Sequence, residues 1–191
     1  MPDLVINIIG YPASGKSRVC EYMLQAGFEV FRPSDMLRAF AKETGAALTG
    51  RQDYVNLHRQ LNERDPYAII EPVLSSSQKQ LCIDGLRCPV LLDKLQADIT
   101  QVVTIALDCP LEIRYQRVQQ DDARKGTHRA PTSLEAFQND EQPDYTNPDR
   151  NLPNMQEMMF RADFTINANQ APTAVIKDLQ KVLGQVATPQ A

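Results

Sequence analysis

Apolar residues along this chain form two kinds of pattern, short continuous runs and longer stretches with helical spacing. Continuous apolar runs of about four to eight residues are typical of buried strands, whereas apolar positions three or four apart mark one face of a helix. Because the two patterns alternate, they predict an α/β fold, with an open parallel sheet covered by helices on both faces. Strands are predicted over Leu4–Ile9, Phe28–Phe31, Leu81–Asp84, Val102–Leu107 and Phe164–Ile166.

Stretches with helical spacing separate the predicted strands. Ser34 is a suitable N-cap for the second of these helices, which is expected over residues 35–42. Residues 138–154 are polar and carry Pro143, Pro148 and Pro153, so they are predicted to form an extended excursion outside the core. The other helices are expected from residue 17 onward and over residues 54–61, 68–74, 90–95, 111–118, 155–160 and 175–183.

The length of 191 residues is enough for one domain with a substantial core. Neither an internal repeat nor a second-domain boundary interrupts the alternation of strands and helices. We therefore expect a single domain over residues 1–187, followed by a frayed tail over residues 188–191.

Composition and charge exclude several classes of protein. A hydrophobic content of 42% and a charged content of 23% are ordinary for a globular domain. The net charge of -4 argues against non-specific binding to nucleic acid or to an anionic membrane. The chain contains no apolar run of about 20 residues, so a cytoplasmic protein without a membrane span is expected. Free, buried thiols are the expected state of Cys20, Cys82, Cys88 and Cys109.

The clearest chemical motif is Gly10-Tyr11-Pro12-Ala13-Ser14-Gly15-Lys16-Ser17, which fits the phosphate-binding pattern GxxxxGK[ST]. It lies between a predicted strand and a predicted helix, as this motif requires. Its glycines let backbone N–H groups converge on one anion, and the start of the helix adds its positive end. Lys16 would reach the terminal phosphates of ATP, and the Ser17 hydroxyl would hold Mg²⁺. The nucleotide-binding residues predicted here are Gly10, Pro12, Ala13, Ser14, Gly15, Lys16, Ser17 and Arg18.

A second polar group follows the third predicted strand. Asp84 comes at the carboxyl end of that strand, where ligands bind in parallel sheets, and Gly85 follows it. Asp84 could hold a water molecule of the magnesium shell, and Arg87 could clamp a phosphate with two hydrogen bonds.

These segments resemble adenylate kinase and the related nucleoside monophosphate kinases. Ser34-Asp35-Met36-Leu37-Arg38 is similar to the family segment whose arginine binds the acceptor phosphate. Asp84-Gly85-Leu86-Arg87 resembles the family's Asp-Gly-Phe-Pro-Arg segment but is one residue shorter, as in archaeal adenylate-kinase-like proteins and phage deoxynucleotide kinases. The resemblance implies the three-layer P-loop NTP hydrolase fold, a five-stranded sheet of order 2-3-1-4-5 and an acceptor flap over about residues 34–76.

The second half of the chain carries further elements of this resemblance. The helix after Pro110 resembles that of dephospho-CoA kinase and adenylate kinase, in which the arginine matching Arg117 belongs to the start of a lid. A lid is therefore expected over about residues 119–132, with Arg124 and Arg129 as candidate phosphate contacts. Residues 167–169 correspond to the place where the family's backbone approaches the nucleotide base.

The sequence therefore predicts an ATP-dependent small-molecule kinase that phosphorylates a nucleotide-like acceptor, with a nucleoside monophosphate as the leading candidate. Two alternatives stay open: a dephospho-CoA-type kinase that phosphorylates a sugar hydroxyl with Asp35 as its base, and a nucleotide-binding switch that uses residues 138–154 as a docking surface. The acidic balance disfavours a polynucleotide-end kinase, and the choice between monomer and dimer stays open.

Flap residues Arg51, Arg59 and Arg64 could touch substrate, and His58 has no identifiable role. The expected catalytic residues are Lys16, Arg38, Asp84, Arg87, Arg117 and Arg124, and Arg117 is also expected to bind the nucleotide. The acceptor residues are Asp35, Arg38, Asp84 and Arg87, and the metal residues are Ser17 and, through water, Asp84.

Overall fold

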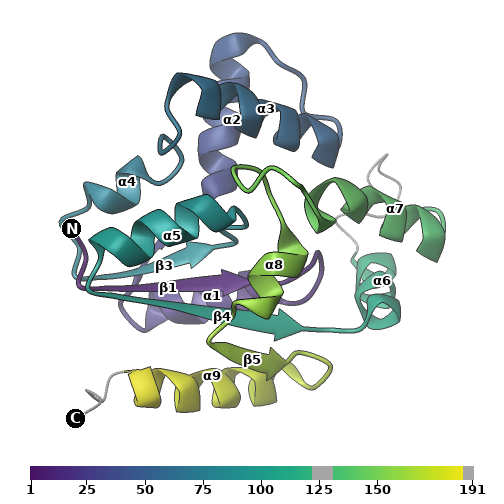
Figure 1. The fold of residues 1–191 in the computed structure, drawn as a ribbon. Coiled ribbons are helices and arrows are strands. Elements are labelled where there is room, and N and C mark those ends of the chain that lie inside the picture. Colours follow the sequence, from purple (N-terminus) through teal and green to yellow (C-terminus); the bar gives the residue numbers. More distant parts are fainter. Residues whose placement is uncertain (122–130, 187–191) are drawn as a thin grey trace.

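The computed structural model describes residues 1–121 and 131–186, in which five parallel strands form one sheet of order β2-β3-β1-β4-β5 (Figure 1). This order confirms the one that the family resemblance implied. The strands are β1 (Leu4–Ile9), β2 (Glu29–Phe31), β3 (Gln80–Asp84), β4 (Gln101–Asp108) and β5 (Phe164–Asn167).

Helices cover both faces of this sheet. Helices α1 (Lys16–Gln25) and α9 (Pro172–Val186) lie on one face, and α5 (Pro89–Asp98) and α8 (Met155–Phe160) lie on the other (Figure 1). The apolar run of β1 is buried because this central strand packs on both sides. Its Ile6 and Ile8 join the core against α1 and α9, whereas Val5 joins the core on the opposite face.

Helices α2 (Pro33–Thr44) and α3 (Arg51–Arg64) pack against each other to one side of the sheet, and the short α4 (Glu71–Leu74) leads back to β3 (Figure 1). The prediction of Ser34 as an N-cap was wrong, because α2 begins at Pro33 and Arg32 is its N-cap. The fixed φ of proline suits the first position of a helix, where its missing N–H has no partner to lose. Ser34 therefore lies inside the first turn.

Helices α6 (Leu111–Gln120) and α7 (Leu134–Tyr145) lie beyond the carboxyl ends of the strands (Figure 1). The predicted excursion over residues 138–154 was wrong for its first half, because α7 is helical to Tyr145 with Pro143 in its last turn. Its polar composition has a specific cause. Glu141 and Asp144 are buried and bind arginines of other elements, so the inward face of this helix carries two carboxylates beside the apolar Phe137.

The remaining predictions concern the lid and the C-terminal tail, the cysteines and the absence of a membrane span. Arg124, Arg129, most of the expected lid over residues 119–132 and the tail over residues 188–191 lie outside the described residues. All four cysteines are buried with free thiols. Within the described part of the chain, no helix has the length and apolarity needed to cross a membrane.

Candidate functional site

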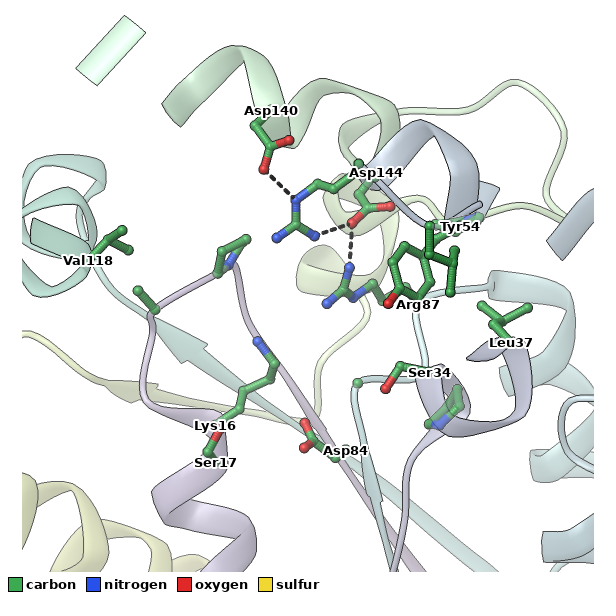
Figure 2. Close-up of a pocket in the computed structure, with 18 of the residues that line it drawn as sticks. Lys16, Ser17, Ser34, Leu37, Tyr54, Asp84, Arg87, Val118, Asp140 and Asp144 are labelled. Atoms are coloured by element: carbon green, nitrogen blue, oxygen red, sulfur yellow. Dashed lines mark hydrogen bonds and ion pairs between the residues drawn. The ribbon is translucent and has the colours of Figure 1, made fainter. Parts of the chain in front are cut away.

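A cleft of about 1670 Å³ opens at the carboxyl ends of the strands (Figure 2). Its walls come from the turn after β1, the helices α2 and α3, the turn after β3, and the helices α6 and α7. Gly10 and Ser14 belong to the turn but do not line the cleft, and the exposed Asp35 does not line it either. The predicted residues that line it are Pro12, Ala13, Gly15, Lys16, Ser17, Arg18, Arg38, Asp84, Arg87 and Arg117.

The phosphate loop, residues 10–17, has a backbone that only particular residues can adopt. Gly10 has φ of 154°, and a Cβ there would lie 2.5 Å from the Ser14 Oγ and 2.9 Å from the Leu107 carbonyl oxygen. Ala13 and Gly15 also have positive φ, of 60° and 106°. Gly15 immediately precedes α1, so the N–H groups of its first turn have no helical partner and can bind an anion.

The Lys16 side chain folds back onto the start of the phosphate loop. Its ammonium donates hydrogen bonds to the Gly10 carbonyl at 2.7 Å and to the Tyr11 carbonyl at 3.3 Å. The pKa of Lys16 is lowered to about 7, mainly by burial and to a smaller extent by the nearby charge of Arg87, while Asp84 opposes the shift. The phosphates of a bound nucleotide would stabilise the charged form of Lys16, because they would place negative charge beside its ammonium group.

The turn after β3 is held beside the phosphate loop by a buried amide. Asn7, in the middle of β1, donates from its Nδ2 to the Leu86 carbonyl at 3.2 Å and accepts from the Leu86 N–H at 3.1 Å. Sequence reasoning assigned no role to Asn7, although an amide inside an otherwise apolar strand was the available signal. Its hydrogen bonds fix the turn that carries Asp84 and Arg87.

Asp84 and Arg87 both face the cleft, as predicted (Figure 2). The Asp84 Oδ2 lies 3.5 Å from the Nε of Arg32, which gives it a cationic neighbour. The Arg87 Nε and the Lys16 Cε each lie 3.8 Å from the point where a Cβ would stand at Gly85. The side chains of the predicted donor and acceptor cations therefore both border Gly85.

Two carboxylates of α7 bind two arginines that line the cleft, Arg51 and Arg87 (Figure 2). The Asp144 Oδ2 accepts a hydrogen bond from the Arg51 Nη1 at 2.8 Å and another from the Arg87 Nη1. The Arg51 Nε donates to the Asp140 Oδ2 at 3.3 Å. Sequence reasoning missed both aspartates, because it predicted no helix there. Arg38 lies apart from this cluster and pairs with Asp35 at the surface.

A second buried ion pair attaches α7 to the phosphate loop. Arg114 of α6 binds Glu141 of α7 with both Nη atoms, and its Nη1 also donates to the Pro12 carbonyl at 3.2 Å. Its guanidinium carbon lies 5.0 Å from the centre of the Tyr11 ring, which stacks on Tyr145 at 5.9 Å between ring centres. Burial raises the pKa of Tyr11 to about 12. Sequence reasoning assigned no role to Arg114.

Arg117 connects the phosphate loop to the turn after the edge strand β5. Its Nη1 donates to the carbonyls of Ala13 at 3.2 Å and Ser14 at 3.3 Å, and its Nη2 donates to the Ala168 carbonyl at 2.7 Å. Ala168 lies in the segment that the resemblance placed beside the nucleotide base. Arg117 thus joins the phosphate loop to the expected base-binding turn.

His58 also lines the cleft, from α3. Its side chain is buried, and its Nε2 has no hydrogen-bond partner among the described residues. Burial lowers the pKa of His58 to about 4, so the imidazole is neutral at neutral pH.

The oxygen donors present fit a magnesium ion. Ser17 and Asp84 both line the cleft, and hydroxyl and carboxylate oxygens are ligands that Mg²⁺ accepts. Over residues 1–121 and 131–186, no cluster of histidine, cysteine and acidic side chains could hold a metal by itself. A magnesium ion here would therefore take most of its ligands from water and nucleotide phosphates, as is usual for this ion.

Comparison with sequence families and curated proteins places this site in context. The model of the AAA domain family matches residues 6–143. A UPF0200/UPF0201 protein from Archaeoglobus fulgidus is 26% identical over 191 residues, covering 96% of this chain and 56% of that protein. A UPF0200 protein from Pyrobaculum aerophilum is 26% identical over 191 residues and is matched over 95% of both chains. The chain thus spans little more than half the length of the Archaeoglobus relative.

Among solved structures, small kinases share the fold. A gluconokinase from Sinorhizobium meliloti matches with a TM-score of 0.57 and 15% identity, over 97% of this chain and 94% of the other. A shikimate kinase from Bacteroides thetaiotaomicron matches with a TM-score of 0.58 and 11% identity, over 95% and 98%. At these identities the likeness concerns the fold alone, which is that of the P-loop kinases.

Proposed function

Since this chain belongs to the AAA domain family and has the fold of the P-loop kinases, we propose that it is an ATP-dependent kinase that phosphorylates a nucleotide-like acceptor, namely a nucleoside monophosphate. One observation carries the proposal. Lys16 of the phosphate loop and Arg87 of the turn after β3 border the same glycine, within one cleft. A donor phosphate bound by Lys16 would therefore lie next to an acceptor phosphate bound by Arg87.

The donor half of the site is the phosphate loop. Its backbone N–H groups and the start of α1 would bind the β- and γ-phosphates, with Lys16 neutralising their charge. Magnesium held by Ser17 and, through water, by Asp84 would offset the remaining charge on these phosphates. Arg117 would hold the loop in place through its hydrogen bonds to the carbonyls of Ala13 and Ser14.

The acceptor half is formed by the arginines that face the loop across Gly85. In the reaction, an oxygen of the acceptor phosphate bonds to the γ-phosphorus as the bond to the β–γ bridging oxygen breaks and ADP leaves. A phosphate monoester has a second pKa near ~6 and is already largely dianionic at neutral pH, so this acceptor needs no general base. Arg87 would hold it in line and neutralise its charge.

The geometry also bears on the two alternatives, a kinase for a sugar hydroxyl and a nucleotide-binding switch. A sugar-hydroxyl acceptor would need a base, and Asp35 was the candidate for that role. Asp35 is exposed, pairs with Arg38 and does not line the cleft. The switch hypothesis used residues 138–154 as a docking surface, yet residues 138–145 belong to α7, whose acidic face binds arginines of the cleft. Both observations favour the monophosphate kinase.

The test is to incubate the chain with Mg-ATP and a pool of nucleoside monophosphates, deoxynucleotides and dephospho-CoA, followed by mass spectrometry. A monophosphate kinase converts one or a few monophosphates to diphosphates in step with ADP formation. Phosphorylated dephospho-CoA would indicate the hydroxyl kinase instead. Release of inorganic phosphate with every acceptor unchanged would indicate the switch.

A further inference from the structure

On the basis of the proposed function, we propose that Asp144 determines which acceptors this site takes, by occupying the anion position between Arg51 and Arg87 so that only a dianionic phosphate displaces it. The Asp144 carboxylate and the acceptor phosphate would thus compete for the same guanidinium groups. The proposal concerns the acceptor side of the cleft, and it adds Arg51 and Asp144 to the residues that bind or select the acceptor.

The geometry at Asp144 is that of a bound anion. Guanidinium groups of two elements, Arg51 of α3 and Arg87 after β3, donate to one oxygen, the Asp144 Oδ2. A phosphate oxygen between two arginines receives hydrogen bonds in the same way. The Asp144 side chain is 8% exposed, whereas those of Arg51 and Arg87 are 24% and 25% exposed. All three residues line the cleft, and the arginines are more accessible from it than the carboxylate.

The carboxylate is held in place by the rest of α7. Glu141, one turn earlier, is locked to Arg114, and Tyr145, the next residue, stacks on Tyr11 of the phosphate loop. The guanidinium groups have more freedom, because each ends a long side chain with rotatable bonds. An arriving phosphate would therefore turn Arg51 and Arg87 toward the cleft rather than push α7 away. For Arg87 this movement is short, since its Nε and Nη2 already lie against Gly85.

Charge decides which acceptors win this competition. The arginines at this point are matched by the carboxylates of Asp140 and Asp144, so the cluster has no net charge to attract a weak ligand. A monoanionic carboxylate would gain no more from the arginines than Asp144 already does. A phosphate dianion has twice the charge and more acceptor oxygens, so it gains more than the aspartate loses.

The experiment follows the arginines directly by NMR of the full ¹⁵N-labelled chain, without ATP. The Nε–Hε signals of Arg51 and Arg87 are assigned with Arg51→Lys and Arg87→Lys variants. Orthophosphate or acetate is then titrated at pH 7.5 and constant ionic strength. We expect orthophosphate, but not acetate, to shift both signals of the wild-type chain. In Asp144→Asn the half-saturating orthophosphate concentration should fall at least about tenfold, and acetate should also bind.

The matched control is Asp140→Asn, one turn earlier on α7, because it removes the same charge from the cluster but leaves Asp144 between Arg51 and Arg87. Its half-saturation should stay within about threefold of wild type. Equal half-saturation in wild type and Asp144→Asn, or weaker binding in the variant, would overturn the proposal. If Asp144→Asn fails to fold, the wild-type titrations decide, since equal responses to acetate and orthophosphate contradict the proposed selection. None of these readouts needs turnover, so they are independent of whether the acceptor pool yields a product.

Discussion

The Lys16 Cε and the Arg87 Nε lie at equal distances, 3.8 Å, from the point where a Cβ would stand at Gly85. This relationship follows from the sheet. Lys16 follows β1 and Arg87 follows β3, and these strands are parallel neighbours whose pairing runs to Ile8 and Asp84 at their carboxyl ends. Neighbouring strand ends thus bring together the two cations that the proposed function assigns to the donor phosphates and to the acceptor.

Replacing Gly10 by alanine should remove nucleotide binding. The new Cβ would lie 2.5 Å from the Ser14 Oγ and 2.9 Å from the Leu107 carbonyl oxygen, at a φ that side chains rarely adopt, so the phosphate loop must rearrange. We expect Mg-ATP affinity, measured by calorimetric titration, to fall at least about a hundredfold. Gly184→Ala is the control, because a Cβ there meets nothing within 4 Å. Unchanged affinity in Gly10→Ala would contradict the role of this loop.

The pKa of Lys16 predicts a particular dependence of stability on pH. Its pKa is lowered from 10.5 to about 7 in the folded chain, so between these values the unfolded chain binds more protons. The free energy of unfolding should therefore rise with pH across this window, by up to about 1.4 kcal/mol per pH unit, and this contribution should be flat below pH 7.

Lys16→Met removes this titrating group while keeping a long side chain. Urea unfolding of both chains at pH 7, 8 and 9 isolates its effect from that of other groups. The stability of the wild type relative to the variant should increase at each step. A difference that stays constant from pH 7 to pH 9 would show that the pKa of Lys16 is not lowered.

Breaking the ion pair between Arg114 and Glu141 should destabilise the whole domain. Both side chains are 6% exposed, so Glu141→Ala would leave the Arg114 charge buried without its partner. The expected loss is about 3–5 kcal/mol of the free energy of unfolding, measured by urea denaturation. Glu135→Ala, at an exposed position on the same helix, should cost less than about 1 kcal/mol. Similar losses in the two variants would argue against a structural role for this pair.

The nature of the acceptor can be tested at Asp35. If the acceptor is a phosphate, Asp35→Asn should leave turnover within about tenfold of wild type, because no base is needed. Glu43→Gln, on the same helix, serves as a control for the loss of a surface charge. A loss above about a thousandfold with binding intact would identify Asp35 as a base and the acceptor as a hydroxyl.

The sequence predicted the sheet and the phosphate loop well, because both depend on local patterns. Each strand is a short apolar run, and the loop has fixed residues at a fixed spacing. The same reasoning placed Asp84 and Arg87 at the cleft, since a strand end is visible in the sequence. Strand order came from the family resemblance and not from the apolar pattern itself.

Helix α7 shows what such patterns miss. Its buried face carries Glu141 and Asp144, which are polar and therefore look like surface residues. Their partners Arg114, Arg87 and Arg51 lie 27, 57 and 93 residues away, so no local window contains both members of a pair. Only the folded arrangement reveals that these carboxylates connect α7 to Arg114 beside the phosphate loop and to Arg51 and Arg87 in the cleft.

The most direct test of the central claim follows the γ-phosphoryl group itself. The chain and its Arg87→Met variant are incubated with [γ-³²P]ATP, Mg²⁺ and pooled nucleoside monophosphates, and the label is separated into nucleotide and orthophosphate. We predict that wild type transfers most of the label to nucleotide and that Arg87→Met transfers at least about a hundredfold less, with ATP affinity retained. Label that appears only as orthophosphate, or equal transfer by both chains, would contradict the account.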